Sequence, residues 1–279
     1  MRVVVIGTGL AGLTATALLA KAGHAVTALE QHEQIGGVTA TLERGGYRWD
    51  WGQMLVPDFG PAEPARLILE ELGVSDQVQA VAGYRENYFP DFRIQHPPEC
   101  LGVYWRKDYL EKLFPEDAAG LDRYYKIYDR VHDISSLVGK KGLAAKLRLW
   151  SKLLPIARKK AWSAQQLMDS CFSRKELQAV FTAILADYVA SPTVFPGLLV
   201  PMINAEGQYD ERLPLQYGRH ERRQSWSYIE NGMGAIVDAL AGAARARGAD
   251  IRTGEAGTDV RIEAGRVTGV ATSSGAEYG

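Results

Sequence analysis

Six residues near the N-terminus, Gly7-Thr8-Gly9-Leu10-Ala11-Gly12, have the spacing with which proteins bind the pyrophosphate of a dinucleotide. The first glycine permits a tight turn, the second lets phosphates approach the backbone, and the third lets the following helix pack closely. The N–H groups at the start of that helix would face the phosphates. The hexapeptide therefore predicts dinucleotide binding if a strand precedes it and a helix follows.

A carboxylate follows this hexapeptide at the distance that a ribose contact requires. Glu30 would accept hydrogen bonds from both ribose hydroxyls, which argues against a 2'-phosphate at that position. We include its neighbour Gln31 in the predicted contact. The alternative is a glycine-rich turn beside a solvated glutamate.

The residues around the hexapeptide show the periodicities of a strand, a helix and a second strand. Residues 2–6 are mostly β-branched, residues 10–21 have apolar side chains at helical spacing, and residues 25–29 are apolar again. Such a succession forms a right-handed βαβ unit with parallel strands. Residues 41–50 predict two short strands around Gly45-Gly46. The predicted fold class is α/β, with a Rossmann-like domain.

A second glycine pair, Gly36-Gly37, is followed by Thr41 and by Gly46-Tyr47-Arg48-Trp49-Asp50-Trp51-Gly52. This combination resembles the flavoproteins of the amine oxidase and phytoene desaturase superfamily. The resemblance implies FAD as the cofactor, a second backbone approach to the pyrophosphate at the doublet, and an aromatic segment beside the flavin. The cofactor contacts implied in this way are Gly36, Gly37, Val38, Thr41, Asp50, Gly52, Gln53, Met54 and Gly257.

Two of these positions depart from the family pattern. Val38 stands where a basic residue usually reaches the pyrophosphate, so that contact is lost or supplied elsewhere. Gly257 stands where a valine usually packs on the adenine, so only a backbone contact is expected there.

Residues 113–121 and 231–240 resemble the phytoene desaturase branch most closely. This resemblance implies an oxidoreductase that transfers a hydride from an apolar, isoprenoid or carotenoid-like substrate to the flavin. Two alternatives stay open: an FAD-dependent amine oxidase, and a non-catalytic binder resembling Rab GDP-dissociation inhibitors. Catalytic side chains are not identified, and the charged cluster at 219–223 is as expected for a solvated loop.

Short strands alternate with helices at both ends of the chain, whereas longer helical patterns occupy its middle. We expect an FAD-binding domain in residues 1–73 and 232–279, interrupted by a substrate or cap domain of helical or mixed structure in 74–231. Helices are predicted over 118–133 and 163–190, and strands over 250–253 and 260–270. The family's last glycine-rich flavin segment has no match, so we expect the chain to be truncated at its C-terminus.

A basic stretch occupies residues 140–160, with eight Lys or Arg and no acid between Asp133 and Asp169. Leu143, Leu147, Trp150 and Leu154 share one helical face until Pro155 breaks the helix, with Arg148 and Lys152 opposite. The pattern suits either a helix at a membrane surface or a cap-domain helix with a solvated basic face.

Composition excludes several other classes of protein. The 279 residues carry a net charge of −1, which gives no global cationic field for nucleic acid. The two cysteines, Cys100 and Cys171, provide neither a disulfide framework nor a metal site. No apolar run approaches the ~18 residues of a membrane span. We expect a protein of the cytoplasm, with membrane association as an open alternative and no nucleic-acid partner.

Overall fold

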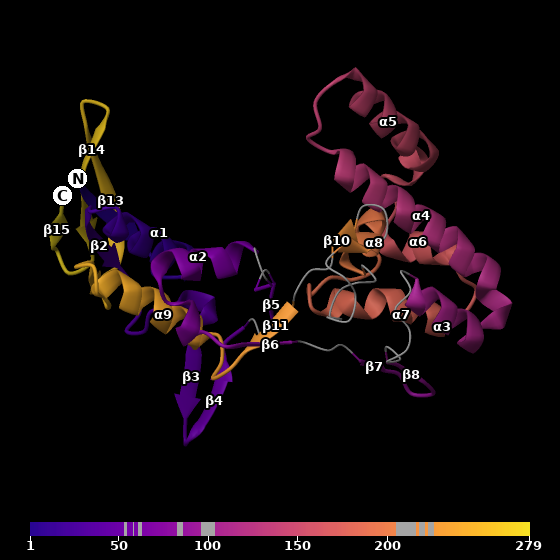
Figure 1. The fold of residues 1–279 in the computed structure, drawn as a ribbon, viewed down its shortest axis with the longest axis horizontal. Coiled ribbons are helices and arrows are strands. Elements are labelled where there is room, and N and C mark those ends of the chain that lie inside the picture. Colours follow the sequence, from indigo (N-terminus) through magenta and orange to yellow (C-terminus); the bar gives the residue numbers. More distant parts are fainter. Residues whose placement is uncertain are drawn as a thin grey trace. The chain divides into compact units, whose positions relative to one another are not determined.

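The computed structural model describes residues 1–52, 55–57, 59–60, 63–82, 86–95, 104–204, 216–217, 221–222 and 226–279. The chain forms two compact units (Figure 1), the first from residues 1–83 and 225–279 and the second from residues 84–224. The polypeptide thus leaves the first unit and returns to it. The sequence places these boundaries near 73 and 232.

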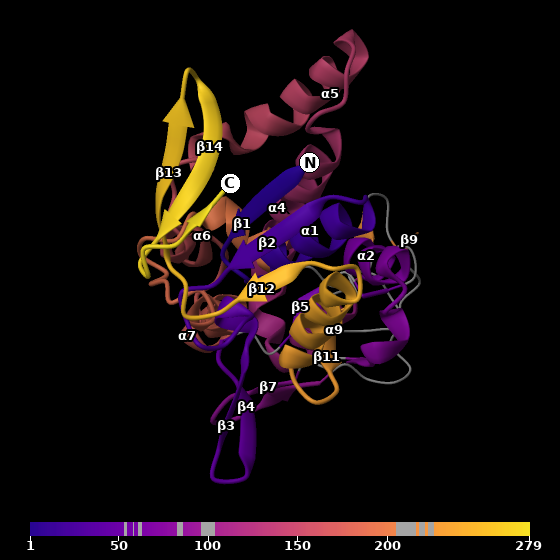
Figure 2. The ribbon, with the colours of Figure 1, turned by 90° about the vertical axis from the view of Figure 1, so that its left-hand side faces the viewer.

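A parallel sheet lies at the centre of the first unit. Strand β2 (Ala25–Leu29) pairs in parallel with β1 (Arg2–Ile6) on one side and with β12 (Asp250–Arg252) on the other. Helix α1 (Leu10–Lys21) connects β1 to β2, and α9 (Gly234–Arg245) precedes β12 (Figure 2). The βαβ unit and the α/β fold predicted from the sequence are confirmed.

Helices α1 and α9 pack against each other through small side chains. Ala17 and Ala20 of α1 and Ala241 and Ala244 of α9 are buried in one apolar cluster, with Leu13 fully covered. Alanine lets two helices approach closely while keeping a high helix propensity. This pair therefore joins the first and last parts of the chain into one core.

Antiparallel strands complete the first unit. The strands β3 (Thr41–Arg44) and β4 (Tyr47–Asp50) form the predicted hairpin, with Gly45 and Gly46 both at positive φ. The expected strand over 260–270 is instead two strands, because the chain turns at Ala264 and Gly265, which also have positive φ. The remaining elements of this unit are β5 (Val56–Pro57), α2 (Pro64–Leu72), β6 (Ala80–Ala82), β11 (Trp226–Ile229), β13 (Gly257–Glu263), β14 (Arg266–Thr272) and β15 (Glu277–Tyr278).

The second unit is mainly helical and has its own aromatic core. The buried rings of Tyr124 and Tyr128 on α4 and of Phe181 on α7 lie at its centre, and Tyr124 and Phe181 have centroids 4.2 Å apart. Its elements are β7 (Asn87–Tyr88), β8 (Arg93–Ile94), α3 (Trp105–Leu113), α4 (Ala118–Leu137), α5 (Leu143–Leu153), α6 (Ala164–Cys171), α7 (Lys175–Thr182), α8 (Val200–Ile203), β9 (Gln216–Tyr217) and β10 (Glu221–Arg222).

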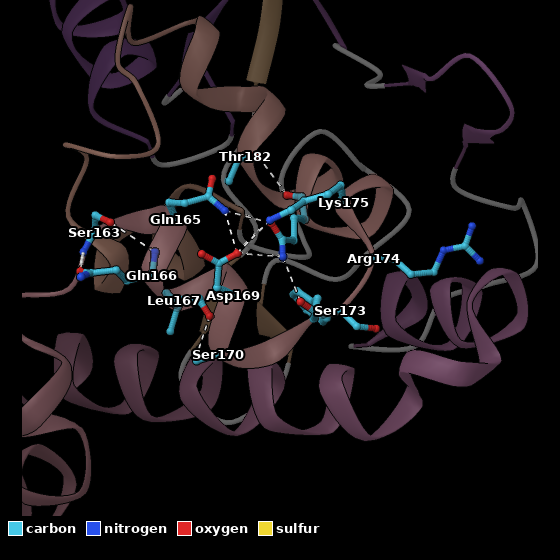
Figure 3. A network of polar contacts seen from close by, with 12 residues as sticks. Ser163, Gln165, Gln166, Leu167, Asp169, Ser170, Ser173, Arg174, Lys175 and Thr182 are labelled. Atoms are coloured by element: carbon cyan, nitrogen blue, oxygen red, sulfur yellow. Dashed lines mark hydrogen bonds and ion pairs between the residues drawn. The ribbon is translucent and has the colours of Figure 1, made fainter.

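The prediction of one helical stretch over 163–190 is wrong, because the chain breaks after Cys171. The carboxylate of Asp117 accepts hydrogen bonds from the N–H and hydroxyl of Ser173 and from the N–H of Arg174, which holds the break against α4. On the other side of the break Asp169 accepts from Gln165 and Lys175 (Figure 3). The hydrogen bond from Lys175 is the main reason that the pKa of Asp169 lies below its ordinary value.

We predict that Gly12→Ala destabilises the protein by about 1–3 kcal/mol, the range for overpacked sites. A Cβ atom there would lie 1.9 Å from the carbonyl oxygen of Gly7, so the turn or the helix must shift. Gly242→Ala is the matched control, since it is also within a helix and its Cβ would meet nothing within 4 Å. The control should gain about 0.5–1 kcal/mol from helix propensity. Urea unfolding of both variants measures the difference, and equal stabilities would contradict this packing.

Candidate nucleotide-binding site

Two glycines have different roles in the turn between β1 and α1: Gly7 adopts a backbone conformation that side chains disfavour, and Gly9 leaves space beside the helix start. Gly7 has φ +93°, and its N–H donates to the carbonyl oxygen of Leu29 at 2.7 Å. Gly9 is the N-cap of α1 with φ −63°, and a Cβ there would meet nothing within 4 Å. The space in front of Gly9 is therefore free for a ligand, and the N–H groups of the first turn of α1 lie beside it.

The glycine doublet lies directly against this turn. The N–H of Gly36 donates to the carbonyl oxygen of Thr8 at 2.9 Å, and Gly36 forms a parallel bridge with Gly9. A Cβ at Gly37 would lie 3.5 Å from the Cα of Gly9. Gly36 and Gly37 also have positive φ, which side chains disfavour. The two glycine segments thus present backbone at the same place, although they are almost thirty residues apart.

A cavity of about 690 Å³ opens at this junction. Eight of the predicted contact residues line it: Gly7, Thr8, Gly9, Glu30, Gln31, Gly37, Val38 and Gly257. Another seven do not, namely Leu10, Ala11, Gly12, Gly36, Thr41, Asp50 and Gly52. The predicted contacts Gln53 and Met54 lie outside the described residues.

Sequence reasoning missed nine residues of the lining. They are Ile6, Leu29, His32, Glu33, Gln34, Ala40, Trp51, Glu255 and Ala256. Most of them are next to a predicted residue, at or just after the end of a strand. Extending the prediction to the residues around each strand end would therefore have found them. Ala256 adjoins the predicted Gly257, but Glu255 had no such signal. It lies just beyond β12, which pairs with β2, and its N–H donates to the carbonyl oxygen of Glu30 at 2.7 Å.

Glu30 is buried at the end of β2 and is already engaged by the protein. Its Oε2 accepts from the N–H of Thr8 at 3.0 Å and from the Thr8 hydroxyl at 2.6 Å, and its Oε1 accepts from the N–H of His32 at 3.0 Å. Burial opposes ionisation, but these hydrogen bonds outweigh it and lower the pKa of Glu30. A carboxylate has about four acceptor positions. Glu30 therefore has room for about one further hydrogen bond, fewer than the two ribose contacts expected from the sequence.

Thr41 and Asp50 contact the start of α9. The Oδ1 of Asp50 accepts from the N–H of Met233 at 2.8 Å, and the hydroxyl of Thr41 accepts from the N–H of Gly234 at 2.9 Å. Free N–H groups at a helix start are commonly satisfied in this way. Gly232 and Gly234 fit closely here, since a Cβ at either would approach the Thr41 hydroxyl within 3 Å.

The two departures from the family pattern have different structural consequences. Val38 is 70% exposed, and no Lys or Arg is among the described residues that line the cavity. A pyrophosphate there would be held by backbone N–H groups and the start of α1. At Gly257 a Cβ would lie 3.3 Å from Cγ2 of Ile6, so Ile6 fills part of the space that a valine would take.

A parallel βαβ unit, a GxGxxG turn, an acid after the second strand and an adjoining glycine doublet define a dinucleotide-binding flavoprotein fold. The model of the family described as flavin containing amine oxidoreductase matches residues 10–278, and the chain belongs to this family. FAD is the cofactor that this fold and family indicate, and the backbone cradle fits it.

Two curated relatives and one solved structure are similar to this chain. All-trans-retinol 13,14-reductase of Rattus norvegicus is 29% identical over 207 residues, which is 68% of this chain and 33% of that protein. Prolycopene isomerase of Daucus carota is 26% identical over 286 residues, 98% of this chain and 44% of that protein. A solved structure of putrescine oxidase has a TM-score of 0.61 at 18% identity, covering 99% of this chain and 56% of that one. The chain thus spans less than half the length of these two curated relatives.

Within the described residues the structure has no helix long and apolar enough to cross a membrane, and no cluster of side chains suited to a metal ion.

We predict that Glu30→Gln weakens FAD binding by about 1–2 kcal/mol, because a carboxylate acceptor is lost and a buried N–H loses its partner. The apo protein should lose stability by a similar amount. Because the pKa of Glu30 is lowered, the wild-type contribution should be complete above the ordinary pKa of glutamate and should be lost progressively as the pH falls from there through the folded pKa. Flavin titration and urea unfolding measure both effects. Glu33→Gln, an exposed glutamate of the same lining, is the control, and an equal effect there would contradict a specific role for Glu30.

We predict that Asp50→Ala lowers the unfolding free energy of the apo protein by about 0.5–2 kcal/mol, the usual value of a helix cap. Asp50→Asn should retain most of the stability, since an amide oxygen also accepts a hydrogen bond. Asp238→Ala, at an exposed position within α9, should change it by less than about 0.5 kcal/mol. A variant Asp50→Ala with normal apo stability but weakened FAD binding would show a cofactor contact instead of a cap.

Proposed function

We propose that this chain carries the FAD-binding unit and a substrate-binding unit of an oxidoreductase that moves a hydride between flavin and an apolar, isoprenoid or carotenoid-like substrate. The observation that carries this proposal is the junction of Gly7–Gly9 with Gly36–Gly37. It places the glycine backbone of Gly7, Gly9 and Gly37, from two distant segments, at one cavity. Such an arrangement has the form of a pyrophosphate cradle.

The roles of the individual residues follow from this geometry. Gly9 and the first turn of α1 would hold the pyrophosphate, and Glu30 would accept a hydrogen bond from the ribose. Ile6, which is 52% exposed and lines the cavity beside Gly257, would provide an apolar contact for the adenine. Bound FAD supplies the hydride acceptor or donor, so the protein has to bind and orient the substrate and exclude water.

The substrate class is supported by relatives and not by a catalytic group of this chain. The retinol reductase and the prolycopene isomerase are both named for apolar polyenes. The name of the family supports an amine oxidase as the second candidate. A non-catalytic binder remains the alternative from another class of protein.

These candidates are distinguished by flavin reduction under anaerobic conditions. The purified protein is first titrated with FAD, and the flavin absorption band is then followed with a panel of retinoids and carotenoids and a panel of amines. Bleaching by polyenes alone supports the proposal, whereas bleaching by amines supports the second candidate. Bound flavin that neither panel reduces, and that no polyene reoxidises after chemical reduction, would contradict both enzymatic functions.

We predict that Gly9→Val weakens FAD binding by at least tenfold while leaving stability within about 0.5 kcal/mol of wild type. The added side chain points into space that is free of protein atoms and has no unfavourable φ to adopt, so only the ligand is obstructed. Flavin titration and thermal unfolding measure the two properties. Full FAD occupancy in this variant would refute the assignment of the cradle.

A further inference from the structure

Helix α5 exposes an apolar face on the second unit. Leu143, Leu147, Trp150 and Leu154 are 74, 62, 61 and 67% exposed. Their spacing of four, three and four residues places them on one side of the helix and of the turn that continues it. Exposed apolar side chains are ordinary when they are scattered, but a continuous row of four indicates a surface for a partner.

This row is not the side by which α5 is attached to the protein. Leu149 and Leu153 are half-buried and Ile156 is 3% exposed, and the helix packs against α4. The ammonium of Lys152 forms an ion pair with Asp133 of α4. Helix α5 therefore has two apolar sides. One packs on α4, which lies next to α5 in Figure 1, and the other has no cover within the described residues.

The charges around the exposed row have one sign. Six cations are exposed there without an ion pair to any described residue: Lys140, Lys141, Lys146, Arg148, Arg158 and Lys160. Two others have partners inside the unit, since Lys152 contacts Asp133 and Lys159 lies 3.6 Å above the ring of Trp162. No acidic residue occurs from 134 to 168. At about 100° per residue, Lys146 borders the apolar row on one side, and Arg148 lies on the other side about 130° from the centre of the row, towards the opposite face.

We propose that this face of α5 docks on the surface of an anionic lipid bilayer, with the apolar row among the acyl chains and the cations at the headgroups. An apolar face with a tryptophan, flanked by Lys and Arg, is the pattern of an interfacial helix. The long basic side chains can bury their stems and keep their charges among phosphates. The helix is far too short to span a bilayer, so it lies on one surface.

Charge favours lipid over a second copy of this chain as the occupant. A symmetric dimer through the row would bring the same six cations of both copies together, and like charges across an interface are unfavourable. An anionic bilayer instead offers a charge opposite to all six. The proposal goes beyond the proposed function and does not depend on bound flavin.

The first test is sedimentation of the protein with vesicles of phosphatidylcholine alone and with about 30% phosphatidylserine. Each cation near an anionic surface contributes about 1 kcal/mol, or about fivefold in affinity, and salt screens it. We expect binding to the anionic vesicles at low salt, weaker binding at high salt, and little binding to phosphatidylcholine. Absence of binding to anionic vesicles would overturn the proposal.

Paired variants then locate the contact. Leu147→Ala with Trp150→Ala should lower anionic-vesicle binding at least tenfold without loss of thermal stability, because both side chains are exposed. The matched control is Ile262→Ala with Val267→Ala, two side chains of similar exposure on the hairpin of β13 and β14, and it should bind as wild type. Lys146→Gln with Arg148→Gln should weaken binding about 25-fold, whereas Arg266→Gln should not.

Three other results would exclude the membrane face. Equal binding by the α5 variant and its hairpin control would place the contact elsewhere. Loss of thermal stability in Trp150→Ala without a change in vesicle binding would show that the row packs against protein. Self-association without vesicles that the α5 variant abolishes would make a second copy the occupant. Since FAD binding is measured separately, these failures are distinguishable from failure of the proposed function.

Discussion

The close approach of backbone to backbone at the Gly7–Gly12 turn is the constraint on which the rest of the first unit depends. Gly12 must lack a Cβ for α1 to lie against the carbonyl of Gly7, and only then does the helix start face the cavity. The doublet at Gly36 meets the same turn through its hydrogen bond to Thr8, and Val237 of α9 covers its other side, since a Cβ at Gly36 would lie 2.9 Å from that side chain. Three segments that are distant in sequence therefore depend on the small size of glycine at one place.

The hairpin that follows the glycine doublet also stabilises helix α9. The carboxylate of Asp50 and the hydroxyl of Thr41, both from the hairpin that follows the doublet, bind the N–H groups at the start of α9. Helix α9 in turn packs on α1 through alanines. Residues that resemble flavin contacts in sequence thus stabilise, by hydrogen bonds, the start of the helix that packs on α1.

Electrostatics at the cavity are unusual for a site that is to hold two phosphates. Glu30, Glu33 and Glu255 line it, and the described lining contains no Lys or Arg. Oriented N–H groups and the positive end of α1 have to supply the favourable field, and they can do so because they are fixed before the ligand arrives. Glu30 is held in its ionised form by Thr8 and His32, so its position is set by the protein and not by the ribose.

The sequence by itself determined the strand-helix-strand unit, the hairpin turn at Gly45-Gly46 and the α5 segment with its basic and apolar residues. Each of these features depends on residue types only a few positions apart. Tertiary structure alone decided that Asp50 caps α9 across 183 residues, that Glu255 joins the cavity, and that Asp117 accepts the hydrogen bonds of the backbone at the break after Cys171. It also decided which apolar side of α5 is covered. Periodicity shows that a face is apolar, but hydrogen-bond partners and packing partners from distant parts of the chain leave no trace in local spacing.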